Sequence, residues 1–411
     1  MADAVALAVE QAARTACRRL VAYLAARSGH VAAAEDALAD AFCAALEAWP
    51  RSGVPQVPEA WLLTAARRRL IDAQRHHAVR DAAAPGLLAI ADAALALSQE
   101  DTAFPDERLK LMFVCAHPAI DAAARTPLML QVVLGVDAAA IASAFVLKPA
   151  AMGQRLARAK AKIRDAAIPY ALPDLRELPS RLDAVLQAVY GAYGMGWDAL
   201  PGADPFVRGL AQSALELGAL LEQWLPAEPE AKGLLALMLH CEARRPARRD
   251  AGGAYVPLSA QDPAHWNAER MAQADHLLAA AAGQRRLGRF QLEAAIQSVH
   301  ARRAVTGSTD WVSIAALYDG LIQQAPTLGV AVARAAAWAQ VSGPQAGLAL
   351  LAALAPESVR SYQPYWALAG ELRAALGDAA LAAEAWRRAI ALCVDPAARA
   401  FLQQRLDALA I

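Results

Sequence analysis

Apolar residues recur at intervals of three and four along most of this chain, a spacing that predicts α-helices with one buried face. Runs of Val, Ile and Thr with alternating polarity are absent, so the pattern predicts no β-strands. In the first 80 residues it predicts a helix that ends near Ser28-Gly29, a second over 33–49 that ends at Pro50, and a third from Glu59 to about Arg80. We expect the inner face of the first helix to carry Leu7, Ala13, Cys17, Leu20 and Leu24. The expected fold class is all-α.

Residues 125–164 carry the most informative pattern, because they predict three consecutive helices at helix-turn-helix spacing. Gly135 breaks the first, apolar helix, since glycine adopts a positive φ readily. Asp137 then stands at the N-cap of a short second helix, and Pro149 suits the first turn of the third. The expected inner-face residues are Leu128, Leu130, Val132 and Val133 in the first helix, Ala140, Ile141 and Phe145 in the second, and Met152, Leu156, Ala159 and Ile163 in the third.

The third of these helices is uniformly cationic outside its apolar stripe. No acidic residue occurs between 148 and 164, so the Lys and Arg residues give the segment a charge of +6. Such a helix suits the major groove of DNA, where cations neutralise phosphates and Arg155 or Gln154 can reach base edges. A solvated basic helix is the alternative, and the two preceding helices favour DNA binding over it. The candidate DNA-binding residues are Lys148, Gln154, Arg155, Arg158, Lys160 and Lys162.

A second basic segment lies at 61–80, where five Arg and one Asp give a charge of +4. A basic helix that begins with an aromatic residue, here Trp61, can hold a separated DNA strand by charge and stacking. Taken alone, the segment favours the alternative, an exposed amphipathic helix whose Trp lies in the core. The candidate residues on this helix are Trp61, Arg67, Arg68, Arg75 and His76.

Composition excludes several classes of protein. The 40 basic and 40 acidic residues balance, so any nucleic-acid site must be a local patch. The five cysteines are scattered without a C-x-x-C pair, which argues against a disulfide framework or a zinc ribbon, and we expect no metal. For Cys115 and His117, which lack partner ligands, packing at a helix end is favoured over metal binding. The N-terminus lacks a signal-peptide pattern and no apolar run spans a membrane, so we expect a cytoplasmic protein with no membrane partner.

The remaining pattern divides the chain into domains. Residues 81–105 carry no Lys or Arg, and they contain Pro85-Gly86 near their start and Pro105 at their end. This composition favours a linker. From Pro169 onward the pattern predicts helices joined by short loops. Near the end, residues fall at the offsets of a tetratricopeptide repeat (TPR), with a looser copy at 327–360, although a plain helical bundle remains an alternative. These residues are Trp366, Gly370, Gly377, Ala382, Trp386 and Ala389, followed by Pro396.

Two basic helical patches separated by a linker resemble the extracytoplasmic-function group of sigma-70-type RNA polymerase sigma factors. The likeness is greatest to the subgroup with a C-terminal, TPR-like helical extension, and it extends over almost the whole chain. It rests on AEDALADAFCAALEAWP at 34–50, PEAWLLTAARRRLIDAQRHH at 58–77, DERLKLMFVCAHPAI at 106–120, GQRLARAKAKIRDAAIPY at 153–170, LPSRLDAVLQAVY at 178–190, GLLALMLHCEARRPAR at 233–248 and YDGLIQQAP at 318–326. Arg67 and Asp72 match the family's A-R-N-x-x-x-D pattern, but Arg68 replaces its Asn.

The resemblance assigns roles to these segments. It implies that 34–50 binds the clamp helices of the polymerase β′ subunit through Glu35, Asp36 and Asp40, with Phe42 and Leu46 in the core. It implies further that 58–77 melts and reads the −10 promoter element and that the helix-turn-helix reads the −35 element. The partners would be core RNA polymerase, at its β′ clamp helices and β flap, and promoter DNA. We therefore expect a region 2 domain at 1–80, a linker at 81–105, a region 4 helix-turn-helix domain at 106–170 and a helical extension at 171–411.

The leading hypothesis is a promoter-specificity subunit with no catalytic residues and no cofactor, whose extension modulates activity and binds a protein or peptide partner. We expect the extension to be required for activity. A non-enzymatic helical-repeat scaffold with solvated basic helices is the competing hypothesis, and it predicts no affinity for polymerase. An enzyme is disfavoured because no G-x-S-x-G, P-loop, dinucleotide fingerprint or H-E-x-x-H pattern occurs.

Overall fold

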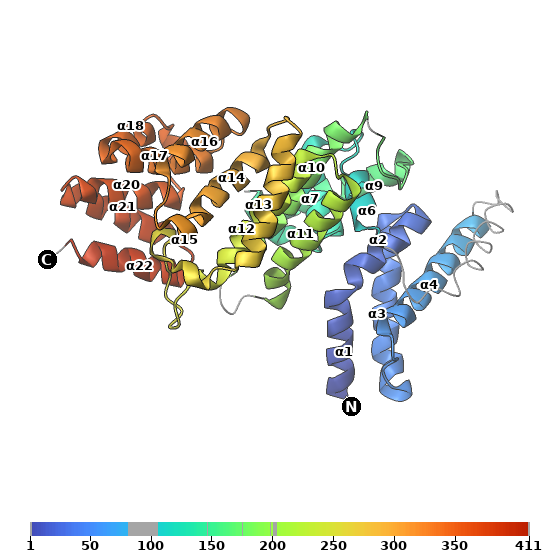
Figure 1. The fold of residues 1–411 in the computed structure, drawn as a ribbon. Helices are drawn as coiled ribbons and strands as arrows, with labels where there is room; N and C mark the ends of the chain where they lie inside the picture. Colours follow the sequence, from blue (N-terminus) through green and yellow to red (C-terminus); the bar gives the residue numbers. More distant parts are fainter. Residues whose placement is uncertain are drawn as a thin grey trace. The chain divides into compact units, whose positions relative to one another are not determined.

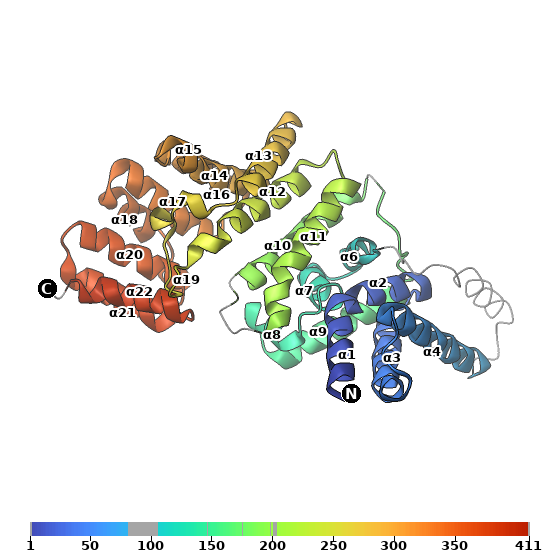
Figure 2. The ribbon, with the colours of Figure 1, turned by 60° about the horizontal axis from the view of Figure 1, so that its bottom comes forward.

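The computed structural model describes residues 2–80, 106–145, 147–174, 176–197, 199 and 204–409, with side chains left out at 2–3 and 73–80. The predicted linker at 81–105 therefore lies outside the described residues. Every regular element in the described ranges is an α-helix or a short 3-10 helix, and one isolated bridge joins Arg249 to Tyr255. The all-α prediction is thus confirmed. The chain forms two compact units, Met1–Leu217 and Gly218–Ile411, which are coloured blue to green and green to red in Figures 1 and 2.

The first unit begins with α1 (Ala2–Thr15) and α2 (Cys17–Ser28), where the sequence pattern predicted a single helix. The chain breaks at Ala16, so each helix buries its own face. The predicted inner face is wrong for the first half of this segment: Leu7 is 62% exposed and Ala13 is exposed, whereas Val5 and Ala12 are buried. The prediction holds for α2, where Leu20 and Leu24 are buried.

Two longer helices, α3 (Val31–Ser52) and α4 (Pro58–Arg80), pack against each other and against α2. The face that α3 buries consists mostly of alanines, together with Leu38, and ends at Trp49. Trp49 is 1% exposed and packs edge-to-face on Trp61 of α4, with ring centroids 5.5 Å apart. Pro50 does not end α3 as predicted: the helix continues for two more residues, to Ser52, although Pro50 has no N–H to donate to the preceding turn. The Gly53 N–H closes the helix on the Trp49 carbonyl at 3.0 Å.

Four further helices span the segment predicted to be a helix-turn-helix, and we call them the helix-turn-helix module: α6 (Arg108–Cys115), α7 (Ala122–Val132), α8 (Ala138–Ala144) and α9 (Pro149–Asp165). The local signals act as predicted. Gly135 has a φ of 78° between α7 and α8, and the Asp137 carboxylate accepts hydrogen bonds from the Ala139 and Ala140 N–H groups at 2.8 and 2.9 Å. Phe145 is 39% exposed and not in the inner face, because α8 ends at Ala144 and Ala142 fills the position beside Ile141. In α9, the predicted stripe of Met152, Leu156, Ala159 and Ile163 is buried.

The first unit is completed by α10 (Leu178–Trp197) and by the start of α11 (Pro205–Trp224), within which the boundary to the second unit falls. Helix α10 packs on α7 and α6, so it shares the core of the helix-turn-helix module. It lies close against α11: a Cβ at Gly196 would be 2.3 Å from the Ala211 backbone nitrogen. Arg108 is 7% exposed and pairs with the nearby Asp106 at 2.7 Å. Its second ion pair, with Glu216 at 3.2 Å, joins α6 to α11.

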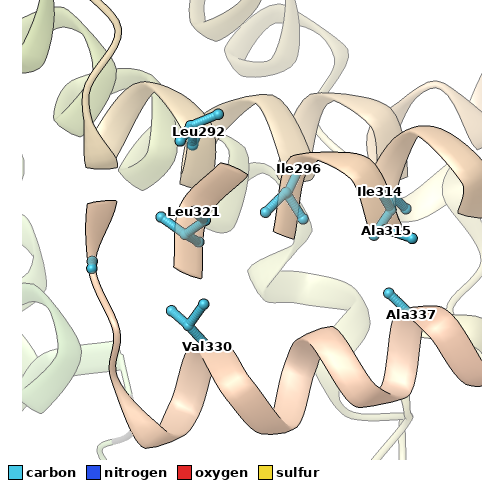
Figure 3. Close-up of a cluster of buried hydrophobic side chains, with 8 residues drawn as sticks. Leu292, Ile296, Ile314, Ala315, Leu321, Val330 and Ala337 are labelled. Carbon is cyan, nitrogen blue, oxygen red and sulfur yellow. The ribbon is translucent and has the colours of Figure 1, made fainter. Parts of the chain in front are cut away.

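The second unit is a succession of antiparallel helices. They are α12 (Pro229–Arg244), α13 (Ala268–Gly283), α14 (Arg289–Ala301), α15 (Arg303–Thr306), α16 (Trp311–Gln324), α17 (Leu328–Ser342), α18 (Pro344–Ala352), α19 (Pro356–Val359), α20 (Gln363–Ala375), α21 (Ala379–Leu392) and α22 (Pro396–Asp407). Figure 3 shows one of its cores, in which Leu292 and Ile296 of α14 meet Ile314 and Leu321 of α16 above Val330 of α17. Sequence neighbours thus pack on one another, as stacked helical pairs do.

The segment predicted to be repeat-like forms a helical hairpin of α20 and α21. Gly377 turns the chain with a φ of 82°, and Trp386 packs so closely on Gly370 that a Cβ there would be 2.4 Å from the indole. Ala382 and Ala389 are buried on either side of Trp386, and Pro396 begins α22. A small residue on one helix and a large one on the next lets the pair approach closely. That pairing supports the TPR-like interpretation, which stays a prediction.

Candidate nucleic-acid interface

The exposed face of α9 presents a row of polar and cationic side chains. Gln154, Arg158 and Lys162 are exposed and follow one another at one-turn spacing, while the apolar stripe on the opposite side of the helix is buried. Lys148 is exposed just before the helix begins. Arg155 is half-buried and donates a hydrogen bond from Nη1 to the Ala123 carbonyl at 3.4 Å, which ties it to the start of α7. Four of the six predicted residues therefore share one accessible surface.

Lys160 lies elsewhere. Its side chain is 19% exposed, and its Nζ lies 2.7 Å from Oε2 of Glu35 in α3, whose side chain is 24% exposed. The residue predicted to bind DNA is thus paired with a residue predicted to bind polymerase, across 125 positions of sequence. Sequence reasoning placed both residues on binding surfaces, since nothing in either helix alone distinguishes them from their exposed neighbours.

A second candidate surface lies on α4. Trp61 and Arg68, together with Ala60, Thr64 and Ala65, line a hollow of about 420 Å³. Arg67 points away from this hollow: it donates a hydrogen bond to the Tyr23 hydroxyl, and its guanidinium lies 5.1 Å from the centroid of that ring. The side chains of the two remaining candidates on α4, Arg75 and His76, lie outside the described residues. Trp61 is only half-buried. Its ring therefore packs on Trp49 in the core and also remains partly accessible from outside.

The outer face of α3 is acidic. Asp36 and Asp40 are exposed one turn apart, and the same face continues through Cys43 to Glu47, which is also exposed. Glu47 was absent from the predicted contact residues, although its spacing from Asp36 and Asp40 was a usable signal. The expectation that Leu46 lies in the core is wrong, because its side chain is 49% exposed beside Glu47. Phe42 is half-buried.

Two cysteines and one tyrosine behind these faces are held neutral by burial. Burial raises the pKa of Cys115 and Tyr170 well above their ordinary values, and the nearby Glu35 carboxylate adds to both shifts. Cys17 behaves alike, because burial raises its pKa more than Arg18 lowers it. Within the described ranges no group of three His, Cys, Asp or Glu side chains is placed to hold a metal ion. No helix in the described part of the chain is both long and apolar enough to cross a membrane.

Comparison with known proteins identifies two domains. Residues 14–80 match sigma-70 region 2, which covers α2, α3 and α4. Residues 181–282 match a family of unknown function, DUF6596, which covers most of α10 and continues through α13. An uncharacterized protein of Rhizobium meliloti (strain 1021) is 37% identical over 382 residues, which is 92% of this chain and 90% of that protein. No solved structure matches the chain.

Proposed function

The chain belongs to the family of its Rhizobium meliloti relative and carries a sigma-70 region 2 domain, and we propose on this basis that it is an RNA polymerase sigma factor that directs promoter-specific initiation. The observation that carries the proposal is a helix-turn-helix with an exposed cationic face in a chain that already contains region 2. In this proposal Gln154, Arg158 and Lys162 contact the −35 element, and Lys148 contacts its phosphates. Chemistry belongs to the polymerase, so the chain needs no catalytic residue and no cofactor.

The remaining contacts divide between two surfaces of the region 2 domain. The acidic outer face of α3, with Asp36 and Asp40, binds the clamp helices of the polymerase β′ subunit. The hollow beside Trp61 and Arg68 holds bases of the melted −10 element, because an indole edge next to a guanidinium offers stacking and charge to an unpaired base. Arg67 positions α4 on α2 through Tyr23 and does not need to touch DNA directly.

The extension takes a supporting role in this proposal. Its first helix, α10, packs on α7 and shares the core of the helix-turn-helix module, so the two segments stabilise each other. Removing the chain after residue 172 would expose the inner face of α7. We therefore propose that the extension is required for activity, and that the TPR-like helices beyond it bind a protein or peptide partner.

A pull-down of core RNA polymerase by the full chain tests the function directly. We expect stoichiometric binding, which Asp36→Lys with Asp40→Lys should abolish by reversing the charge of the docking face. Asp183→Lys with Asp407→Lys is the matched control, because both carboxylates are exposed, the net charge changes equally and neither lies on α3. Binding that survives the first pair, or is lost equally in the control, contradicts the docking surface. A chain that never binds core polymerase supports the scaffold hypothesis instead.

A further inference from the structure

The connection between α12 and α13 in the second unit contains a small hairpin, drawn in yellow in Figure 1, which we call the clasp. It runs from Arg248 to Val256, and the Val256 N–H donates a hydrogen bond to the Arg248 carbonyl at 2.9 Å. At its tip, the Asp250 carboxylate accepts hydrogen bonds from the Gly252 and Ala254 N–H groups, each at 2.9 Å. The shape of the clasp therefore comes largely from its own hydrogen bonds.

Two side chains on opposite arms of the hairpin fasten the clasp to α22. Arg249 and Tyr255 are joined by the isolated bridge, so they stand directly opposite each other. The Arg249 Nη2 atom lies 2.8 Å from Oδ2 of Asp395, which precedes α22. The Tyr255 ring packs edge-to-face on Phe401 of α22, with ring centroids 5.6 Å apart. The start of α22 thus offers a site, the α22 site, that takes a guanidinium and an aromatic ring side by side.

The α22 site is held in place by the helix itself. Asp395 uses Oδ1 to accept a hydrogen bond from the Ala397 N–H at 2.9 Å, which caps the helix and leaves Oδ2 to face the clasp. Phe401 is half-buried and packs against the core cluster around Trp386. Both groups are therefore positioned by contacts that do not involve the clasp, so the α22 site is preformed.

The clasp, by contrast, is weakly held on this site. The side chains of Arg249 and Asp395 are 28% and 26% exposed, and an ion pair so open to water contributes little because solvent screens it. Residues 250–254, which form the tip, are all exposed. A segment with few buried contacts opens at a small cost in free energy. The clasp can therefore leave α22 while the unit stays folded.

The chain that follows the clasp is anchored elsewhere. Arg303 of α15 donates hydrogen bonds to the Ser259 and Gln261 carbonyls at 2.9 and 2.7 Å. Its guanidinium also lies 5.1 Å from the centroid of the Trp266 ring. These contacts hold the connection in place on α15, so opening is confined to the hairpin.

We propose that the α22 site is a docking site for a partner protein, and that the clasp occupies it in the free chain in place of that partner. The partner presents an arginine beside an aromatic residue, as the clasp does, because the site offers one carboxylate next to one aromatic ring. One site cannot hold both, so the partner displaces the clasp. This inference rests on the proposed role of the extension in binding a protein partner, and it specifies the chemistry of that partner.

A synthetic peptide with the sequence of residues 246–257 tests the α22 site by fluorescence anisotropy with the full chain. In the wild type the clasp competes with the labelled peptide, whereas Arg249→Ala with Tyr255→Ala leaves the site open. We expect this opened variant to bind the peptide about ten-fold more tightly than the wild type, as for a clasp that is closed about nine-tenths of the time. A peptide with alanine at both positions is the control probe and should bind to neither protein. Arg249→Glu, which repels Asp395, is a second opened variant in case the double variant fails to fold.

A substitution within the site separates specific binding from a general loss of structure. In the opened variant, Asp395→Asn should weaken peptide binding about two- to five-fold, the range for one partly exposed ion pair. Asparagine keeps the cap on α22, so the helix stays intact. Asp378→Asn is the matched control, because Asp378 is exposed at the N-cap of α21 and should leave binding unchanged.

The outcomes separate the two parts of the proposal. Equal affinity of the wild type and the opened variants for the peptide overturns the clasp as the occupant. Absence of binding to the opened variants at millimolar peptide, or binding that Asp395→Asn does not weaken, overturns the α22 site. The pull-down of core polymerase is a separate measurement, so failure of the α22 site leaves the sigma-factor function standing. If polymerase never binds, the peptide still decides whether α22 carries a docking site.

Discussion

The exposed face of α9 makes a quantitative prediction about how DNA binding depends on salt. Each cation that neutralises a phosphate contributes about 0.9 to the slope of log affinity against log salt concentration. Arg158 and Lys162 are exposed one turn apart on this face. Replacing both by alanine should therefore lower the slope by about 1.8. Between about 50 and about 200 mM salt, the wild-type protein should lose about twelve-fold more affinity than the variant.

Fluorescence anisotropy of the full chain with a labelled duplex, titrated over that salt range, measures the slope. Arg176→Ala with Arg208→Ala is the matched control, because both arginines are exposed in the first unit and lie outside α9. Gln154→Ala should leave the slope unchanged and instead reduce the preference for one sequence over another, since an uncharged side chain releases no counterion. Equal slopes in the wild type and the Arg158/Lys162 variant would refute the assignment of this face to the phosphate backbone.

Two further predictions concern the stability of the second unit. Burial lowers the pKa of His300, which packs edge-to-face on Trp311, to about 4. As the pH falls, the imidazole is protonated in the unfolded chain before it is protonated in the folded protein. Up to about 3 kcal/mol of the free energy of unfolding should therefore be lost between about pH 6.5 and about pH 4. Urea unfolding at several pH values should show this loss in the wild type and not in His300→Gln. The Glu230 carboxylate accepts hydrogen bonds from the Phe290 and Gln291 N–H groups at 2.9 and 3.1 Å and so caps α14. Glu230→Ala should lower the free energy of unfolding by about 2 kcal/mol, and an unchanged melting temperature would count against the cap.

The helices and turns of the helix-turn-helix module were predictable because their signals are local. Asp137 caps the residues two and three positions ahead, and Gly135 needs only its own backbone freedom to turn the chain. The buried stripe of α9 repeats every three or four residues, so a single segment contains the evidence for it. Where all the interactions that decide a structure lie within one segment, the sequence alone was sufficient to predict that structure.

The errors fall where the deciding contact lies elsewhere in the chain. The break at Ala16 carries no glycine, proline or capping side chain. The periodic pattern therefore predicted one continuous helix and wrongly placed Leu7 on its buried face. Leu46 continues the apolar spacing of α3, but no neighbouring helix covers it in the described residues. Lys160 and Lys162 are alike in sequence, and only packing against α3 separates the one that is paired from the one that is exposed.

The close contacts at Gly196 and Gly370 restrict the substitutions that this chain can accept during evolution. At Gly196 the neighbouring atom is backbone nitrogen, which no mutation can trim, so this position is closed to every larger residue unless two helices move apart. At Gly370 the obstacle is the Trp386 side chain, which mutation can shrink. Descendants of this sequence can therefore exchange bulk between α20 and α21 in paired steps, while the crossing of α10 and α11 must keep its glycine.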